Sequence, residues 1–147
     1  MASTPLSNTG VSWDGRAPLA EFIEQAKAAE AGGAATLWVS CHLFLRDPVT
    51  AAHAALAATA RIRVALMAMS PYTVHPVYIS MAAAALDELF PGRVLLCLGV
   101  GVPGDLAAAG IESLKPLKTL REAIRVCRAL FSGEAIAHQG EVFKVAG

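Results

Sequence analysis

Neither sign of charge dominates this 147-residue sequence, because 12 Lys and Arg residues balance 12 Asp and Glu residues. Without an excess of positive charge, the chain lacks the basic surface with which proteins hold nucleic acids or anionic membranes. No nucleic-acid partner and no membrane partner are therefore expected. The hydrophobic share of 55% excludes extended disorder, which requires low hydrophobicity together with high net charge.

Cysteines are few and far apart, with Cys41, Cys97 and Cys127 as the three in the chain. An odd number of cysteines without a Cys-x-x-Cys pair indicates neither a disulfide framework nor a zinc ribbon. No group of His, Asp and Glu residues has the spacing of metal ligands, so no metal site is predicted. A reducing, cytoplasmic environment is the default expectation for such a chain.

Charged residues are also missing from residues 64–86, a stretch long enough to cross a bilayer. Pro71, Pro76 and the polar residues between them interrupt the stretch, which favours a strand, a loop and a helix over a membrane span. Residues 1–10 contain no basic cluster followed by an apolar run, so a signal peptide is not expected.

Strand and helix patterns alternate along the rest of the sequence. The helices are expected to open at or beside prolines, because a proline in the first turn loses no hydrogen bond. The predicted helices are residues 18–31, 49–60, 76–89 and 116–131. The predicted strands are residues 6–10, 36–40, 62–69 and 94–98, and residues 135–145 are expected to form a small hairpin with a turn at Gln139-Gly140.

Four strand–helix units in succession predict an α/β fold with a parallel sheet and right-handed crossovers. Two architectures fit this order, an open doubly wound sheet and part of a closed (β/α)8 barrel. No linker divides the chain, so residues 1–147 are expected to form a single domain.

A glycine-rich segment follows the fourth predicted strand. Residues 99–104 match Gly-x-Gly-x-x-Gly, which in dinucleotide-binding proteins brings backbone N–H groups onto a pyrophosphate. Such a unit also requires an acidic residue at the end of the next strand, about 20 residues on. That position falls at Glu122, inside a predicted helix. A tight turn that lets the backbone pass close to a neighbour is the simpler interpretation, and a Rossmann-type NAD-binding protein remains an alternative.

Other candidate site residues lie at the ends of the second and third predicted strands. His42 follows the second strand, at the end of the sheet where ligands bind in parallel α/β folds, and an imidazole there can act as donor or base. The neighbouring Cys41 is interpreted as a structural thiol. His75 is interpreted as a capping or packing residue, and His53 and His138 as surface residues.

Three stretches together resemble the luciferase-like monooxygenase family. They are residues 37–43, where the family usually reads Trp-Val-Ser-Asp-His, residues 61–76, and residues 86–101. Their spacing also agrees, and the resemblance covers about residues 19–145. It implies a TIM-type (β/α)8 barrel that binds FMN or the deazaflavin coenzyme F-420.

The family resemblance also implies roles for particular residues. His42 matches the active-site histidine after the second strand, and Gly99 and Gly101 match glycines that give the cofactor ring room at the fourth strand. A non-proline cis peptide that supports the ring maps to Met67–Ala68. Cys41 stands where many relatives carry an acid, so any role of that carboxylate is absent.

Length sets the last expectation, because a complete barrel needs at least about 200 residues. Four strand–helix units make the N-terminal half of one, and the family holds the cofactor phosphate largely with the later half. The resemblance implies an oxidoreductase or monooxygenase working by hydride transfer or by oxygen activation, with weak cofactor binding by this half alone. A non-catalytic half-barrel subunit is the alternative.

Cutting a barrel after four units exposes strand edges and inward-facing side chains, expected to include Leu66, Leu96 and Leu98. We therefore expect a homodimer or association with a separate C-terminal half.

Overall fold

A computed structural model of the chain describes residues 8–133 and 135–147. Four strands alternate with helices, and a short hairpin follows. The strands are β1 (Gly10–Trp13), β2 (Thr36–Ser40), β3 (Arg63–Met69) and β4 (Val94–Leu98), with the hairpin formed by β5 (Ala137–Gln139) and β6 (Lys144–Ala146). The helices are α1 (Leu19–Ala31), α2 (Pro48–Ala58), α3 (Pro76–Leu89), α4 (Pro103–Ala108) and α5 (Pro116–Phe131).

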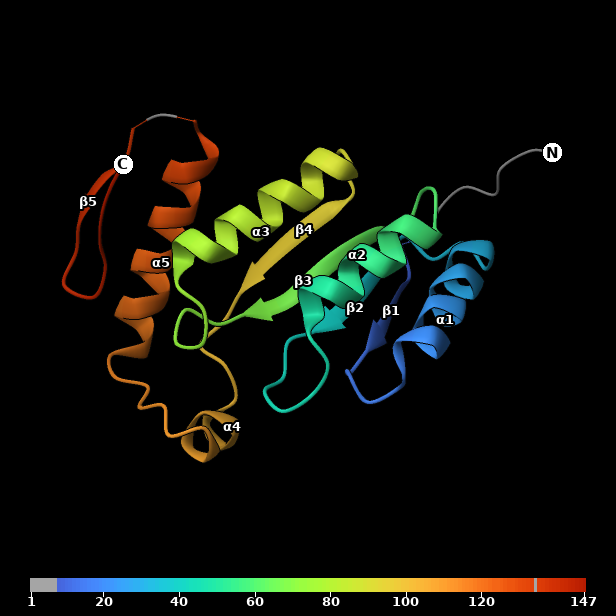
Figure 1. Cartoon of the computed structure of the whole chain (residues 1–147), viewed down its shortest axis with the longest axis horizontal. Helices are drawn as coiled ribbons and strands as arrows, with labels where there is room; N and C mark the ends of the chain where they lie inside the picture. The colour runs from blue at the N-terminus through green and yellow to red at the C-terminus, as the bar shows by residue number, and fades with distance from the viewer. Residues whose placement is uncertain (1–7, 134) are drawn as a thin grey trace.

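The four long strands form one parallel sheet whose spatial order follows the sequence, β1-β2-β3-β4. Figure 1 shows α1, α2 and α3 beside one another along this sheet. A sequential order with crossover helices on one face is the arrangement of a barrel segment, whereas a doubly wound sheet reverses its order at a switch point. The α/β half-barrel prediction is confirmed, and the Rossmann-type alternative does not fit the strand order.

Prolines and caps define the helix starts as predicted. Pro18 precedes α1, and Pro48, Pro76 and Pro116 each occupy the first turn of a helix. The Asp47 carboxylate accepts a hydrogen bond from Thr50 N at 2.6 Å, which satisfies a donor that the first turn leaves without a partner. The charge-poor stretch 64–86 divides into β3, a loop and α3, and no helix in the described residues is long and apolar enough to span a bilayer.

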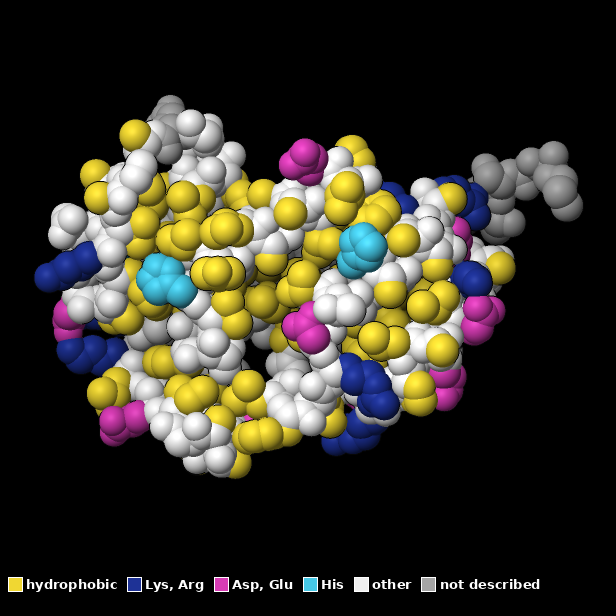
Figure 2. All heavy atoms as spheres, viewed as in Figure 1, with side chains coloured by type: hydrophobic (Ala, Val, Ile, Leu, Met, Phe, Trp, Pro, Cys, Tyr) yellow, Lys and Arg dark blue, Asp and Glu magenta, His cyan; other side chains and the backbone are white. Residues whose placement is uncertain are grey.

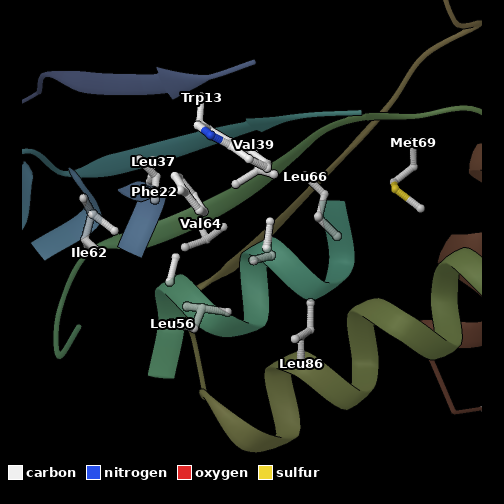
Figure 3. Packing of buried hydrophobic residues seen from close by; sticks show 14 of the residues in the cluster. Trp13, Phe22, Leu37, Val39, Leu56, Ile62, Val64, Leu66, Met69 and Leu86 are labelled. Atoms are coloured by element: carbon white, nitrogen blue, oxygen red, sulfur yellow. The ribbon is translucent and has the colours of Figure 1, made fainter. Parts of the chain in front are cut away.

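The main core lies between the sheet and its helices. Phe22 of α1, Leu56 of α2 and Leu86 of α3 pack against strand residues that include Leu37, Val39 and Val64 (Figure 3). Phe22 is fully buried and stacks on Trp13 with ring centroids 4.3 Å apart. One face of each strand is thereby covered by apolar helix surface.

The expectation that Leu66, Leu96 and Leu98 point into the barrel is wrong. Leu66 is buried in the core against the helices, and Leu96 and Leu98 pack on the same cluster (Figure 3 labels Leu66). Because side chains alternate along a strand, the opposite, inner face carries their neighbours, among them Met67 and Cys97. A continuous apolar run offers no polar–apolar alternation, so the sequence could not assign the faces.

Two further differences concern the elements themselves. The first strand is Gly10–Trp13 rather than residues 6–10, of which residues 6 and 7 lie outside the described residues. Its place is fixed by Trp13, which is buried on Phe22 while its backbone pairs with Val39. Helix α4, in the expected glycine-rich loop, was not predicted.

The hairpin is confirmed, and it is attached to α5 through a small apolar cluster of Ala123, Val126, Ile136 and Phe143. The interpretation of His138 as a surface residue is wrong, because its side chain is mostly buried with Nε2 3.7 Å from Glu122 Oε2. His53 is exposed, and His75 caps α3 by accepting Val77 N at 3.3 Å, as expected.

Candidate active site at the carboxyl ends of the strands

A cavity of about 320 Å³ opens at the carboxyl end of the sheet. Its walls come from residues 41–48 after β2, from Met69, Ser70, Thr73 and Val74 after β3, and from Gly101, Val102, Asp105 and Leu106 after β4. Three strand–loop junctions therefore meet here, as parallel strands require when their carboxyl ends share one edge. The prediction that His42 and Gly101 lie at the same end of the sheet is confirmed.

His42 lines this cavity with its side chain about one-third exposed, at 38%. Its Nδ1 lies 3.6 Å from Oδ2 of Asp105, which stands in the first turn of α4 and is exposed to a similar degree. The pair joins the loop after β2 to the segment after β4. Sequence reasoning missed Asp105, although Pro103 followed by an acidic residue is itself a helix-start signal.

Met67 and Ala68 are joined by a cis peptide bond, as the resemblance implied. The strand register between β3 and β4 shifts at this point, between Leu66 and Met69. Met67 O accepts a hydrogen bond from Cys41 N at 3.0 Å, so the irregular segment is tied to the residue before His42. Met67 and Ala68 do not line the cavity themselves, but they lie at the strand end that borders it.

A side chain is disfavoured at each of the two glycines after β4, but for different structural reasons. A Cβ on Gly99 would lie 2.9 Å from the Ala68 Cβ, so a side chain there would collide with the irregular segment of β3. Gly101 has a φ of +88°, a left-handed conformation that glycine adopts without strain. A Cβ on Gly101 would also press on Ser70 Oγ and Leu106 Cδ1, both at 3.3 Å. Gly101 lines the cavity, and Gly99 does not.

The Cys41 thiol lies in the cavity wall but is not poised to react. Burial is the main cause that raises its pKa to about 12, so the sulfur remains protonated at neutral pH. Its Sγ contacts Val39 O at 3.8 Å and Met69 Sδ at 3.6 Å. This environment fits the structural role expected for Cys41. Among the described residues, no group of three or more His, Cys, Asp and Glu side chains is arranged to hold a metal ion.

Comparison with curated proteins finds relatives that match most of this chain and are themselves more than twice as long as the matched part. The 5,10-methylenetetrahydromethanopterin reductase of Archaeoglobus fulgidus is 31% identical over 121 residues, which are 82% of this chain and 36% of the relative. The F420-dependent glucose-6-phosphate dehydrogenase of Gordonia bronchialis is 30% identical over 141 residues, covering 86% of this chain and 42% of the relative.

Solved structures share the fold. The coenzyme F420-dependent tetrahydromethanopterin reductase of Methanopyrus kandleri superposes with a TM-score of 0.87 at 20% identity, over 97% of this chain and 45% of that protein. A long-chain alkane monooxygenase gives a TM-score of 0.83 at 17% identity, over 98% of this chain and 48% of that protein. The chain thus spans less than half the length of each of these four proteins.

The family model described as luciferase-like monooxygenase matches residues 2–147. The match extends from the segment before β1 through the hairpin and includes every strand–loop junction that forms the cavity. This chain belongs to the luciferase-like monooxygenase family.

Proposed function

We propose that this chain is the N-terminal half of a luciferase-like oxidoreductase barrel and supplies the ring-binding part of its FMN or coenzyme F-420 site. The observation that carries the proposal is the cavity at the strand ends, where the segments holding His42, Ser70 and Gly101 converge. The curated relatives, one of them an F420-dependent dehydrogenase, support a deazaflavin as the first cofactor to test.

The cavity suits the ring of such a cofactor better than its phosphate. Apolar side chains such as Met69, Val74 and Leu106 form much of the wall, as is usual for small-molecule sites. Among the described residues, Arg46 is the one Lys or Arg that lines the cavity, and its Nη1 donates to Gly15 O at 3.0 Å and Arg16 O at 2.7 Å. We infer that the phosphate is held by the C-terminal half of the barrel.

A bound F-420 or FMN supplies hydride transfer, and a reduced FMN also supplies reaction with oxygen. In this proposal His42 acts at the ring edge as hydrogen-bond donor or base, since an imidazole exchanges protons near neutral pH. Met67, Ala68 and Gly99, at the strand ends that border the cavity, would support its wall, and Gly101 in the lining would keep the backbone after β4 close to the ring. The substrate is a small molecule held between this half and the other.

The C-terminal half completes the site from a continuation of the same polypeptide or from a second chain. A groove of about 580 Å³ runs between β4, α3 and the end of α5, lined by Val94, Leu96, Phe131, Ala83, Ala84 and two acidic residues. β4 is the last strand in the order of the described sheet. A further parallel strand pairing with β4 would cover this groove, as barrel closure requires.

Association with a second copy is proposed through α3. Its outward residues Tyr78, Met81 and Leu89 are each more than half exposed, and Figure 2 shows hydrophobic side chains spread over this helix. Apolar patches of this kind mark interaction surfaces. Sedimentation at micromolar concentration tests whether two copies associate. A chain that sediments as a monomer at these concentrations contradicts the proposal.

Cofactor binding is tested by titrating the chain with FMN and with F-420 and following fluorescence. We expect binding in the micromolar range or weaker, further weakened by Gly101→Leu, which fills the cavity. Gly104→Ala is the matched control, because nothing lies within 4 Å of a Cβ at that position. Absence of binding with the C-terminal half supplied contradicts the proposal and favours a non-catalytic half-barrel. Submicromolar FMN affinity of this half alone contradicts the assignment of the phosphate to the other half.

A further inference from the structure

Five titratable or charged side chains of the described residues line the cavity, Cys41, His42, Arg46, Asp47 and Asp105. Three of them are committed to structural contacts. The Cys41 thiol is half-buried and neutral, the Arg46 guanidinium donates to two backbone carbonyls, and the Asp47 carboxylate caps α2. His42 and Asp105 remain, and they face each other at 3.6 Å.

We propose that Asp105 is a positioning residue for His42, holding the ring with Nδ1–H toward the α4 carboxylate and the unprotonated Nε2 toward the cavity. The inference rests on the proposed function insofar as the cavity is the cofactor or substrate site. Asp105 then acts as carboxylates do beside many functional histidines. It holds one ring nitrogen in place so that the other nitrogen can accept or exchange a proton.

The geometry gives Asp105 this role rather than a purely structural one. The two residues come from segments 63 positions apart, 42 and 105, so local sequence does not impose their contact. The side chain of Leu106, the next residue, is buried against the protein and fixes the first turn of α4. Asp105 is only partly buried, and within the described residues no backbone N–H donates to its carboxylate, although its main-chain carbonyl accepts Ala109 N.

An anchored tautomer matters because the two neutral forms of histidine offer the cavity opposite groups. With the proton on Nδ1, Nε2 is an acceptor and a base. With the proton on Nε2, the same atom is a donor and cannot take a proton. A carboxylate facing Nδ1 selects the first form. His42 is then a base or acceptor toward the cavity, which narrows the two roles left open above.

The tautomer can be measured directly by nitrogen-15 NMR of the imidazole ring at pH 8, where the chain has four histidines to distinguish. The measurement works in solution and, by magic-angle spinning, on sedimented protein, so association of the chain does not obstruct it. A His42→Gln variant identifies the His42 signals. We expect the Nδ1–H form to predominate in the unaltered chain.

Three variants separate positioning from general charge effects. Asp105→Ala should reverse the ratio to the Nε2–H form that an unanchored side chain favours, and Asp105→Glu should restore the original ratio. Asp47→Asn removes a charge from the same cavity while keeping a capping oxygen, and it should leave the ratio unchanged. Ala and Glu suit a helix interior, so both Asp105 variants are compatible with α4.

A ratio that Asp105→Ala leaves unchanged, or that Asp47→Asn changes equally, overturns the proposal. Cofactor titration of the same proteins is a separate readout. Absence of FMN and F-420 binding by the unaltered chain supplied with the C-terminal half would refute the proposed function, while the tautomer result would still decide whether Asp105 positions His42.

Discussion

Two glutamates in different parts of the chain hold the backbone in the same way. Glu30, at the end of α1, accepts N–H groups from Ala60, Arg61 and Ile62 at 2.5–3.1 Å. Glu122, in α5, accepts N–H groups from the three consecutive hairpin residues 141–143 at 2.9–3.1 Å. Each carboxylate satisfies a run of backbone donors that lies outside regular secondary structure.

The surroundings of the two carboxylates differ. The loop that Glu30 holds is also held by Arg93, which donates to Leu56 O, Thr59 O and Ile62 O at 3.0–3.1 Å. This loop leads directly into the main core. We call β1–β4 with α1–α3 the body, and α5 with the hairpin the C-terminal arm. In the arm, the apolar cluster has four buried members, with a few partly buried side chains packed against them. The same contact is therefore one of several in the body and a principal one in the arm.

Phe22→Ala should produce the largest effect, because it removes a fully buried ring from the body. Deletions of this size in a well-packed core cost about 3–5 kcal/mol, a large part of the stability of a small domain. Urea denaturation should show the loss across the whole body. Leu117→Ala, at a position 78% exposed on α5, is the control and should shift the free energy of unfolding by less than about 0.5 kcal/mol.

Glu122→Gln should loosen the arm while leaving the body folded. Replacing the carboxylate by an amide leaves the N–H groups of residues 141–143 poorly satisfied. Phe143 N is buried and the other two are partly buried, so we expect a cost of about 1–3 kcal/mol. Amide exchange at these positions should accelerate roughly tenfold to a hundredfold. Glu30→Gln is the matched control, and exchange at Ala60, Arg61 and Ile62 should change less, since Arg93 still holds that loop. Equal acceleration at both places would contradict the contrast.

Acid should release the same contacts, and the arm should respond first. N–H donation by Phe143, above all, lowers the pKa of Glu122 below its ordinary value of 4.5. For Glu30, burial acts to raise the pKa, and the N–H donors of the loop outweigh it, so that this pKa is lowered too. Since the folded pKa is the lower one, both contributions are complete above about pH 4.5 and decline as pH falls through the folded value.

Protection factors of hairpin and loop amides, followed from pH 6 to pH 3, measure this release. Hairpin protection should decline before loop protection, and the Glu122→Gln protein should show no such decline in its hairpin. A pH-independent hairpin in the unaltered chain would mean that the Glu122 carboxylate contributes little to holding it.

Gly140→Ala should disturb the arm without changing any charge. A Cβ at this position would lie 2.6 Å from Glu122 Cδ and 2.6 Å from His138 Nε2, so the carboxylate must turn away from its donors. We expect faster exchange at residues 141–143, at most as large as that caused by Glu122→Gln. Gly104→Ala, where a Cβ meets nothing, is the control and should leave the hairpin as it was.

The sequence predicted those elements whose ends are marked by neighbouring residues in the chain. Strand 94–98 and helices 76–89 and 116–131 appear with the predicted bounds, because prolines and glycines lie at or near their ends. Features that depend on contacts between distant segments were missed. Leu66, Leu96 and Leu98 were assigned to the wrong face of the sheet. Glu122 was considered only as an acidic residue in the wrong place for a dinucleotide-binding unit, whereas its partners lie 19–21 residues further on.

The candidate site divides in the same way. His42 and Gly101 were predicted from their positions after strands, and the parallel sheet brings them to one cavity. Asp105 was not, because α4 is short and its acid acquires a partner only when the loop after β2 folds beside it.

Glu141→Gln should have the smallest effect on hairpin protection. Comparison with Glu122→Gln therefore separates the contribution of an exposed carboxylate from that of a buried one. Glu141 forms ion pairs with Lys115 and Lys118, and hydrogen bonds from these lysines lower its pKa to about 2. Its side chain is nevertheless about half exposed, and exposed ion pairs add little because water and salt screen them. Hairpin protection should therefore remain within experimental error of the unaltered chain, at low and at high salt. A loss matching that of Glu122→Gln would show that charge near the hairpin, rather than satisfaction of its backbone N–H groups, keeps the arm in place.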